Sequence, residues 1–445
     1  MRAALLGGGG FRVPLLYGAL AASGIELDGV VLHDIDPERL AVVAAVLGSD
    51  GPPVTTTGDL DEALDGADLV FAAIRAGGVD ARVADEQEAI DAGVIGQETV
   101  GAGGLASILR VVPEADAIAA RIALRAPGAW TISMTNPAGV VTEAMACRLG
   151  ERVIGVCDSP VGLIRRVSVA LGLDPGPSLA AVTGAGEVDY LGINHLGWLR
   201  SFAVDGVDRL PELLADPARL EGFEEGALFG ADLVRALGAV PNEYLYWYYA
   251  RREAMLGITS AARTRAEHVR QRQQEFYAAA TAAPADAAAL WRRANDERNR
   301  SYLAELRDGD RDETDVATGG YESVAVALAD ALTGGPPARL VLNVANGSTV
   351  AALDPDAVVE TVCDVDASGP AARPVAPLTD HQLGLVAAVR ASERAAMTAA
   401  RTGSADDALR AFATHPLIDS IDVARRLSVR AMERAKSLSV TSLRV

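Results

Sequence analysis

Short apolar runs and longer helical patterns alternate along the first third of the chain. Apolar runs of strand length occupy residues 1–6, 27–33, 68–74, 130–134 and 153–156. Helical patterns follow the first and the fourth of these runs directly. An alternation of strands and helices without a break predicts an α/β fold, with a Rossmann-type, doubly wound parallel sheet.

The pattern changes after Pro160. Residues 186–200 alternate like one strand, with Asn194 and His195 near its centre. Further strands and helices, together with an alanine-rich break, are expected in this part of the chain: strands at 339–344 and 358–365, helices at 161–171, 260–277, 381–401 and 406–412, and the break at 278–289. The length of 445 residues favours two domains. We expect a Rossmann domain over 1–160 and an α+β domain over 161–445.

A glycine turn joins the first strand to the first helix. Gly7, Gly8, Gly9 and Gly10 end the strand, and the missing side chains would let the backbone approach a pyrophosphate at the helix N-terminus. The third glycine of the dinucleotide-binding motif is replaced by Arg12, so a plain glycine turn remains an alternative.

Two aspartates follow the second strand. A carboxylate at this place can accept a hydrogen bond from a ribose 2′-hydroxyl, and Asp34 in this role favours NAD, because a carboxylate repels an added 2′-phosphate. The alternative role for Asp34 or Asp36 is to cap the helix that starts at Pro37, and we expect one of the pair to do so.

Charge and composition exclude several classes of protein. The chain has 40 basic and 60 acidic residues, a formal charge of −20, which opposes binding to nucleic acid or to anionic membranes through a general field. Three cysteines are too few for a disulfide framework and suit a reducing cytoplasm. No apolar run is long enough to span a bilayer. We therefore expect a cytoplasmic protein without nucleic-acid or membrane partners.

A cysteine and a carboxylate stand side by side where the strand at 153–156 ends. Cys157 and Asp158 would lie at the carboxyl edge of the sheet, where open α/β sheets bind ligands. With His195, Cys157 could supply a ligand set for Mn, Fe, Co, Ni or Zn. The alternatives are a buried cysteine, a helix-capping aspartate and a core histidine.

Two polar segments and one aromatic segment add candidate chemistry. Residues 75–86 are charged and start on glycine hinges, which argues against a simple crossover helix. Residues 93–104 are a glycine-rich loop with Gln97 and Glu98, read either as backbone that passes close to a ligand or as a flexible connection. Tyr244, in an aromatic cluster, could act as an acid or a base.

Ten motifs in order give the chain a resemblance to a known family. They are GGGGFRVP, DIDPERL, IRAGGVDARVADE, GVIGQETVGAGG, MTNPAGVVTEA, GVCDSP, GINHLGW, NEYLYWYY, TRAEHV and AVVE. Together they resemble glycoside hydrolase family 4, the NAD-dependent glycosidases related in fold to lactate and malate dehydrogenases, and most closely its 6-phospho-β-glucosidase branch. The resemblance runs from the first strand to about Leu417.

The resemblance implies a redox mechanism in place of the usual two carboxylates. Bound NAD takes a hydride from C3 of the sugar, a base removes the acidified proton at C2, the aglycone leaves C1, water adds and the hydride returns. A divalent metal, Mn²⁺, held by Cys157 and His195 would stabilise the oxygens at C2 and C3. A homodimer or homotetramer is the expected assembly.

The resemblance also assigns roles to single residues. Tyr244 matches the base, with Tyr246 as the alternative in a shifted register, Glu98 matches an acidic neighbour that assists it, and Asp158 matches the proton donor of the phospho-α-glucosidases. Cofactor contacts are expected from Gly7, Gly8, Gly9, Gly10, Phe11, Asp34, Arg39, Arg75 and Asn136. Substrate contacts are expected from Arg82, Asn136 and Arg265, the last of these at the sugar phosphate.

Departures from the family pattern leave the substrate open. Thr318 stands where the β branch usually has an arginine, which favours an unphosphorylated glycoside as the second hypothesis. Asp158 favours the α branch, whereas GINHLGW favours the β branch. A 2-hydroxy acid dehydrogenase or a dinucleotide sensor is the third hypothesis.

Overall fold

The first six strands form a parallel sheet of the Rossmann order. A computed structural model of the protein describes residues 1–49, 51–173, 186–300 and 320–442. The strands run in the order β3-β2-β1-β4-β5-β6. They are β1 (Arg2–Leu6), β2 (Gly29–His33), β3 (Val54–Thr57), β4 (Leu69–Ala72), β5 (Trp130–Ser133) and β6 (Val153–Gly155). All neighbours among them pair in parallel, so the expected doubly wound sheet is confirmed.

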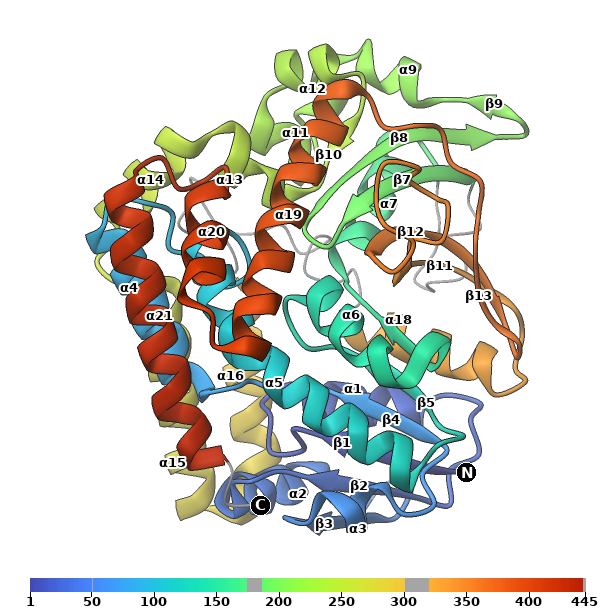
Figure 1. The fold of residues 1–445 in the computed structure, drawn as a ribbon. Helices are drawn as coiled ribbons and strands as arrows, with labels where there is room; N and C mark the ends of the chain where they lie inside the picture. The colour runs from blue at the N-terminus through green and yellow to red at the C-terminus, as the bar shows by residue number, and fades with distance from the viewer. Residues whose placement is uncertain (50, 174–185, 301–319, 443–445) are drawn as a thin grey trace.

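The strands of the second half extend the same sheet. Antiparallel pairing continues it in the order β6-β11-β12-β7-β8-β10, with β9 on β8 and β13 on β12. These strands are β7 (Glu187–Ile193), β8 (Leu196–Val204), β9 (Val207–Asp208), β10 (Val240–Pro241), β11 (Ala338–Ala345), β12 (Val358–Asp366) and β13 (Gly369–Ala372). Figure 1 shows the two halves as one continuous layer. The division at residue 160 stays a prediction, and the sheet runs across it.

Helices cover both faces of the sheet because alternate strand residues are apolar on both sides. In β1, Ala3 and Leu5 enter one hydrophobic cluster, whereas Ala4 and Leu6 enter another. The helices are α1 (Val13–Ala21), α2 (Pro37–Leu47), α3 (Leu60–Leu64), α4 (Gly78–Asp91), α5 (Gly101–Arg125), α6 (Ala138–Leu149), α7 (Ser159–Ala170), α9 (Leu210–Leu214), α10 (Pro217–Leu220), α11 (Glu224–Phe229), α12 (Ala231–Leu237), α13 (Tyr246–Tyr249), α14 (Arg251–Ser260), α15 (Arg265–Ala282), α16 (Ala287–Arg300), α18 (Tyr321–Leu332), α19 (Asp380–Thr402), α20 (Ala405–Thr414) and α21 (Ile421–Ser442).

Three local expectations are wrong. Residues 186–200 are not one strand but most of the β7–β8 hairpin, whose two-residue turn holds Asn194 and His195. Residues 78–91 form a helix, α4, which begins at the second residue of the Gly77–Gly78 pair, both at positive φ. The long helix starts at Arg265, because the Thr264 side chain and Glu267 form a capping box, and it runs to Ala282 with only a short break before α16.

Candidate functional site

The glycine turn closes tightly on the ends of β2 and β4. The N–H groups of Gly7 and Gly8 both donate to the carbonyl of His33, at 2.9 and 2.7 Å. A Cβ on Gly7, which has φ +82°, would collide with the carbonyl oxygen of Ala73, and one on Gly9 would lie 2.8 Å from the Cβ of Arg39. The turn therefore requires glycine at these two positions for its own path, and it leads directly into the N-terminus of α1.

The structure separates the roles of the two aspartates after β2. Asp34 accepts a hydrogen bond from the N–H of Gly9 at 2.9 Å, so its carboxylate lies beside the glycine turn. Asp36 accepts from the N–H groups of Glu38 and Arg39 and is the N-cap of α2. The capping alternative thus applies to Asp36 and leaves Asp34 at the turn.

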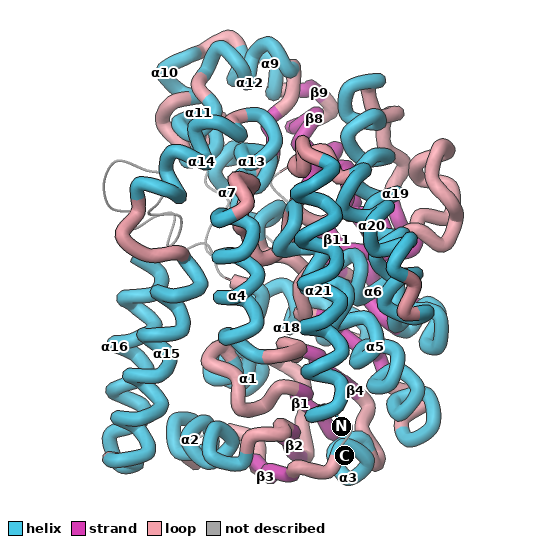
Figure 2. The backbone as a smooth tube through the Cα atoms, turned by 60° about the vertical axis from the view of Figure 1, so that its left-hand side comes forward, coloured by secondary structure: helices cyan, strands magenta, loops and turns pink. Residues whose placement is uncertain are grey.

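A hairpin of α15 and α16 packs over the glycine turn. Figure 2 shows these two helices side by side next to α2. The Tyr277 hydroxyl donates to the Gly9 carbonyl at 2.7 Å, and the Trp291 indole donates to the Phe11 carbonyl at 2.8 Å. The Arg39 guanidinium lies 4.4 Å from the centre of the Tyr277 ring. The Phe11 side chain is buried against Phe276 and Trp291.

These aromatic contacts were not expected from the sequence. The relevant residues lie about 270 positions from the turn, and their local context looks like an ordinary charged helix. One signal was available, since Phe276 and Tyr277 directly follow a run of six polar residues at 270–275.

Two arginines enclose Glu98. Arg82 donates to Glu98 at 2.6 Å and to Glu86 at 2.7 Å, and Arg75 also pairs with Glu98. Burial alone would raise the pKa of Glu98, but the charges of Arg75 and Arg82 outweigh it and lower the pKa to about 2. Glu98 is therefore a permanent anion, and Tyr244 lies close enough to Arg82 to interact with its charge.

His195 offers one free ring nitrogen. Its Nδ1 lies 2.8 Å from the Thr99 hydroxyl, and its ring stacks on Tyr244 with centroids 3.6 Å apart. Its Nε2 is buried and has no hydrogen-bond partner among the residues that the structure describes. Burial lowers the pKa of His195 to about 3, so the imidazole is neutral and its unpartnered nitrogen can serve a metal. Tyr246 instead packs against Phe229 and Trp247.

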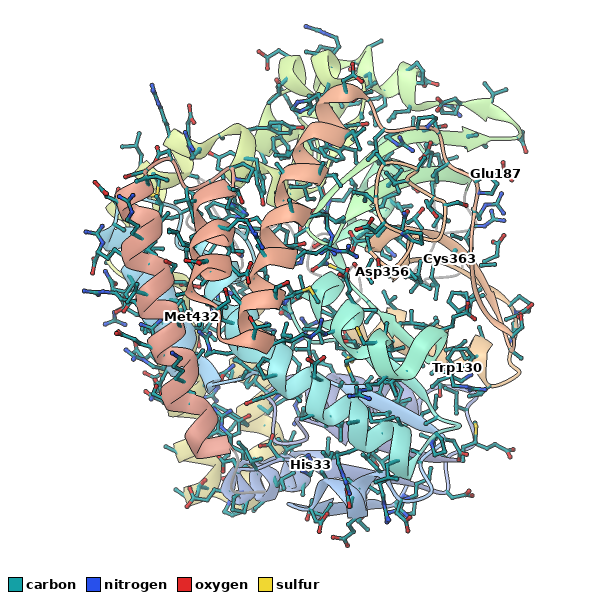
Figure 3. The ribbon with its side chains drawn as sticks, viewed as in Figure 1. His33, Trp130, Glu187, Asp356, Cys363 and Met432 are labelled. Atoms are coloured by element: carbon teal, nitrogen blue, oxygen red, sulfur yellow. The ribbon has the colours of Figure 1, made fainter. Side chains whose placement is uncertain are left out.

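Cys157 lies just after β6, beside Tyr321. Its thiol is buried, 4.0 Å from the Tyr321 hydroxyl, whereas Cys147 is exposed and Cys363 is buried in β12 (Figure 3). Burial raises the pKa of Cys157 well above its ordinary value, and the charges of Glu360 and Asp158 raise it further. No group of three His, Cys, Asp or Glu side chains suited to a metal occurs in the described parts of the chain. A metal on Cys157 and His195 would need further ligands from substrate or solvent.

Asp158 faces a cluster of arginines that the sequence did not predict. Arg12 lies 3.7 Å from Asp158 and 3.3 Å from Glu322, with its guanidinium over the Tyr321 ring. Burial, followed by the charges of Arg12 and Arg265, lowers the pKa of Arg298 to about 9, so these three arginines act on one another. Asp158 and Glu98 partly offset this positive charge.

The remaining predicted residues divide between these groups. The Asn136 amide nitrogen lies 3.4 Å from the Tyr321 hydroxyl, which connects it to Cys157. Arg265 is the first residue of α15 and interacts electrostatically with Arg298. Thr318 lies outside the described residues. Nowhere in residues 1–442, masked segments aside, does a helix have the length and apolarity needed to cross a membrane.

Comparisons with known proteins assign the chain to one family over most of its length. Residues 3–173 match the model of the family 4 glycosyl hydrolases, and residues 190–418 match the model of the C-terminal domain of these enzymes. A probable 6-phospho-beta-glucosidase of Bacillus subtilis strain 168 is 29% identical, with 97% of this chain and 96% of the relative covered.

Two solved structures have the same fold. The 6-phospho-beta glucosidase of Thermotoga maritima, solved with manganese, NAD⁺ and glucose-6-phosphate, has a TM-score of 0.81 at 24% identity over 98% of this chain and 99% of that one. A 6-phospho-alpha-glucosidase from gut microorganisms, solved with NAD and Mn²⁺, has a TM-score of 0.79 at 24% identity over 98% of both chains. Both α- and β-specific enzymes are thus among the similar proteins.

Proposed function

Because this chain belongs to glycosyl hydrolase family 4, we propose that it hydrolyses O-glycosidic bonds of 6-phospho-β-glucosides, with NAD and a divalent metal, Mn²⁺, as its cofactors. The observation that carries this proposal is the pairing of a buried, unpartnered Nε2 of His195 with the stacked ring of Tyr244. A metal ligand and a candidate base in contact are what C2 deprotonation next to a C3 ketone requires.

The residues present fit both cofactors. The glycine turn, the α1 N-terminus and Asp34 would hold NAD, and Cys157 with His195 would hold the metal. When bound, NAD would oxidise C3 of the sugar and the metal would polarise the oxygens on C2 and C3. The cofactors of the two similar solved structures support this assignment.

The chain's own residues supply the proton transfers. Tyr244 would take the C2 proton, held in place by the face of His195 and by the charge of Arg82. Asp158, at the start of α7 and opposite Arg12, would give a proton to the leaving oxygen. Glu98 would offset the charges of Arg75 and Arg82 and so fix them in place.

The arginine cluster favours a phosphorylated sugar. Arg12, Arg265 and Arg298 concentrate positive charge near Asp158. Burial and then mutual repulsion lower the pKa of Arg298, and an anionic ligand would relieve that repulsion. The names of the curated relatives agree with a phosphate on the substrate. The second candidate is the same mechanism on α-linked or unphosphorylated glycosides, which Asp158 and Thr318 favour. A 2-hydroxy acid dehydrogenase is the least supported reading.

The test compares four aryl glucosides, α and β, each with and without a 6-phosphate. We expect cleavage of the 6-phospho-β-glucoside only when NAD and Mn²⁺ are both present, with exchange of the C2 hydrogen in heavy water and no net formation of NADH. Cleavage that survives chelation, without exchange, would contradict the mechanism. Faster cleavage of an α-linked or unphosphorylated compound would move the substrate to the second candidate.

The two neighbouring tyrosines provide a matched pair for the base. Tyr244→Phe keeps the ring that stacks on His195 but removes the hydroxyl, so kcat should fall by about 10²–10⁴-fold. Tyr246→Phe, in a ring packed on Phe229, should change kcat by less than about threefold, because a group away from the reacting atoms makes no such contribution. The C2 exchange rate should follow kcat in both variants. The opposite order of effects would transfer the role to Tyr246.

A further inference from the structure

Two polar residues, flanked by two glycines, lie in one row across the antiparallel part of the sheet beside the candidate metal site. Asn343 in β11 pairs with Gly155 in β6 and with Glu360 in β12, and Glu360 pairs in turn with Gly192 in β7. Directly opposed residues point to the same face of a sheet. Cys157 lies two residues after Gly155, and the charge of Glu360 adds to burial in raising the pKa of the Cys157 thiol.

Glu360 is buried and receives hydrogen bonds from three parts of the chain. Its carboxylate accepts from the side chains of Asn343 at 2.9 Å, Asn194 at 3.3 Å and Tyr190 at 3.0 Å, and the residue is 1% exposed. A Cβ on Gly197 would collide with the Tyr190 hydroxyl, so a glycine is needed for the tyrosine to reach Glu360.

No cation pairs with Glu360 in the described part of the chain. All its hydrogen-bond donors are neutral side chains. A buried carboxylate without a counter-ion costs free energy that an apolar residue of similar size would not. Because an apolar residue would pack at lower cost, we expect Glu360 to have a role other than packing.

The Asn194 side chain links Glu360 to the turn that carries His195. Its amide nitrogen donates to Glu360, and its carbonyl accepts from the N–H of Ala138, the first residue of α6, at 3.0 Å. His195 has φ +63°, a left-handed conformation that costs a residue with a side chain about 1–2 kcal/mol. A turn strained in this way persists only when its surroundings hold it.

We propose that Glu360 is a positioning residue that, through Asn194, holds the Asn194–His195 turn so that the His195 Nε2 faces the divalent metal. The inference rests on the proposed function for the metal, but the shape of the turn can be measured without it. Glu360 touches neither metal nor substrate in this scheme and acts only through the orientation of His195.

The experiment measures the turn and the metal separately. Hydrogen–deuterium exchange over residues 190–200 of the metal-free protein reports the turn, and titration with Mn²⁺ followed by electron paramagnetic resonance reports metal affinity. Glu360→Ala should speed exchange at the turn by about tenfold or more and weaken Mn²⁺ binding by about 10–100-fold. Glu360→Gln should stay within about threefold in both, because its amide can still accept from both asparagines and donate to Tyr190.

The control is another buried carboxylate that anchors the same strand. Glu143 accepts from the N–H of Val358 in β12 and pairs with Arg394 at 3.1 Å, but it does not contact the turn. Glu143→Ala should lower stability without changing either readout. If Glu360→Ala fails to fold, Asn194→Ala breaks the same link and should give the same two effects.

The outcomes distinguish the inference from the function it rests on. Unchanged exchange at the turn in both Glu360→Ala and Asn194→Ala, or equal effects in Glu143→Ala, would overturn the positioning role. A wild-type protein that does not bind Mn²⁺ would overturn the proposed metal dependence, while the exchange data would still decide the role of Glu360.

Discussion

At the scale of single residues, the two aspartates after β2 permit a matched test of the cofactor site. Asp34→Ala removes a carboxylate that lies beside the glycine turn, and hydrogen bonds to charged groups contribute about 1.5–3 kcal/mol, so NAD should bind about 10–100-fold more weakly. Asp36→Ala removes the α2 cap together with a 3.7 Å ion pair to Arg39, and the loss of the cap should cost about 1 kcal/mol of stability.

Calorimetric titration with NAD measures the cofactor affinity of each variant. Urea unfolding measures its stability. The prediction requires that the Asp34 variant change affinity much more than stability and that the Asp36 variant do the reverse. Equal losses of NAD affinity in both variants would mean that Asp34 acts through the helix and not on the ribose.

Sequence reasoning at this scale identified residues with distinctive chemistry and missed those whose role depends on distant contacts. Cys157 was singled out because it stands beside Asp158 at the end of a strand, and His195 because imidazoles are scarce in the chain; the structure stacks His195 on Tyr244. Arg12 was noted only as the residue that breaks the glycine motif. Its partners Asp158 and Glu322 lie about 150 and 310 positions away, and no local pattern connects them.

At the scale of elements, α15 links the two ends of the site. It begins with Arg265, near Arg298, and reaches the Gly9 carbonyl through Tyr277, twelve residues on, or about 18 Å along a helix axis. Tyr277→Phe removes one hydrogen bond worth about 1 kcal/mol and should weaken NAD binding by about fivefold, with little change in KM for the sugar.

Calorimetric titration with NAD and a measurement of KM for the sugar separate this effect from general damage to the helix. Phe276→Leu, one residue away in the same packing cluster, keeps the Tyr277 hydroxyl and serves as the control. A Tyr277 variant that raises KM for the sugar as much as Kd for NAD would show that α15 moves as a whole.

The elements also show where periodicity fails. Residues 187–204 alternate as strands do, but alternation cannot show that a chain reverses, and the two-residue turn at Asn194–His195 lacks the glycine that usually signals a hairpin. The start of α15, by contrast, has a local signal, the capping-box spacing of Thr264 and Glu267, which the expected start at residue 260 overlooked.

At the scale of the whole molecule, the strand–helix alternation was enough to predict the parallel half, since each βα unit is local. The antiparallel half was harder to predict, because β11 and β12 insert between β6 and β7 although almost 150 residues separate them from β7 in sequence. That insertion brings Glu360 and Asn343 next to Asn194. The pairing of distant strands, not any local motif, creates the support for the His195 turn.

The packing of α20 and α21 onto the rest of the fold predicts how stability depends on pH. His415 lies in the turn between these helices, where it is buried and its Nδ1 accepts from the N–H of Leu417 at 3.1 Å. Burial lowers the pKa of His415 from 6.5 to about 3. Between pH 6.5 and about pH 3, the unfolded chain binds a proton at His415 that the folded chain does not. The free energy of unfolding is therefore undiminished above pH 6.5, and it falls as the pH drops towards 3.

This single group should contribute a slope of up to about 1.4 kcal/mol per pH unit below its unfolded pKa. His415→Gln keeps an acceptor for Leu417 but cannot bind a proton at these pH values. Urea unfolding at pH 7.5 and pH 5 should therefore show a smaller acid-induced loss of stability in the variant, by about 2 kcal/mol, even if the variant is less stable at pH 7.5. Because the other shifted histidines are present in both proteins, the difference in slope isolates His415, and equal slopes would show that its ring becomes protonated without unfolding.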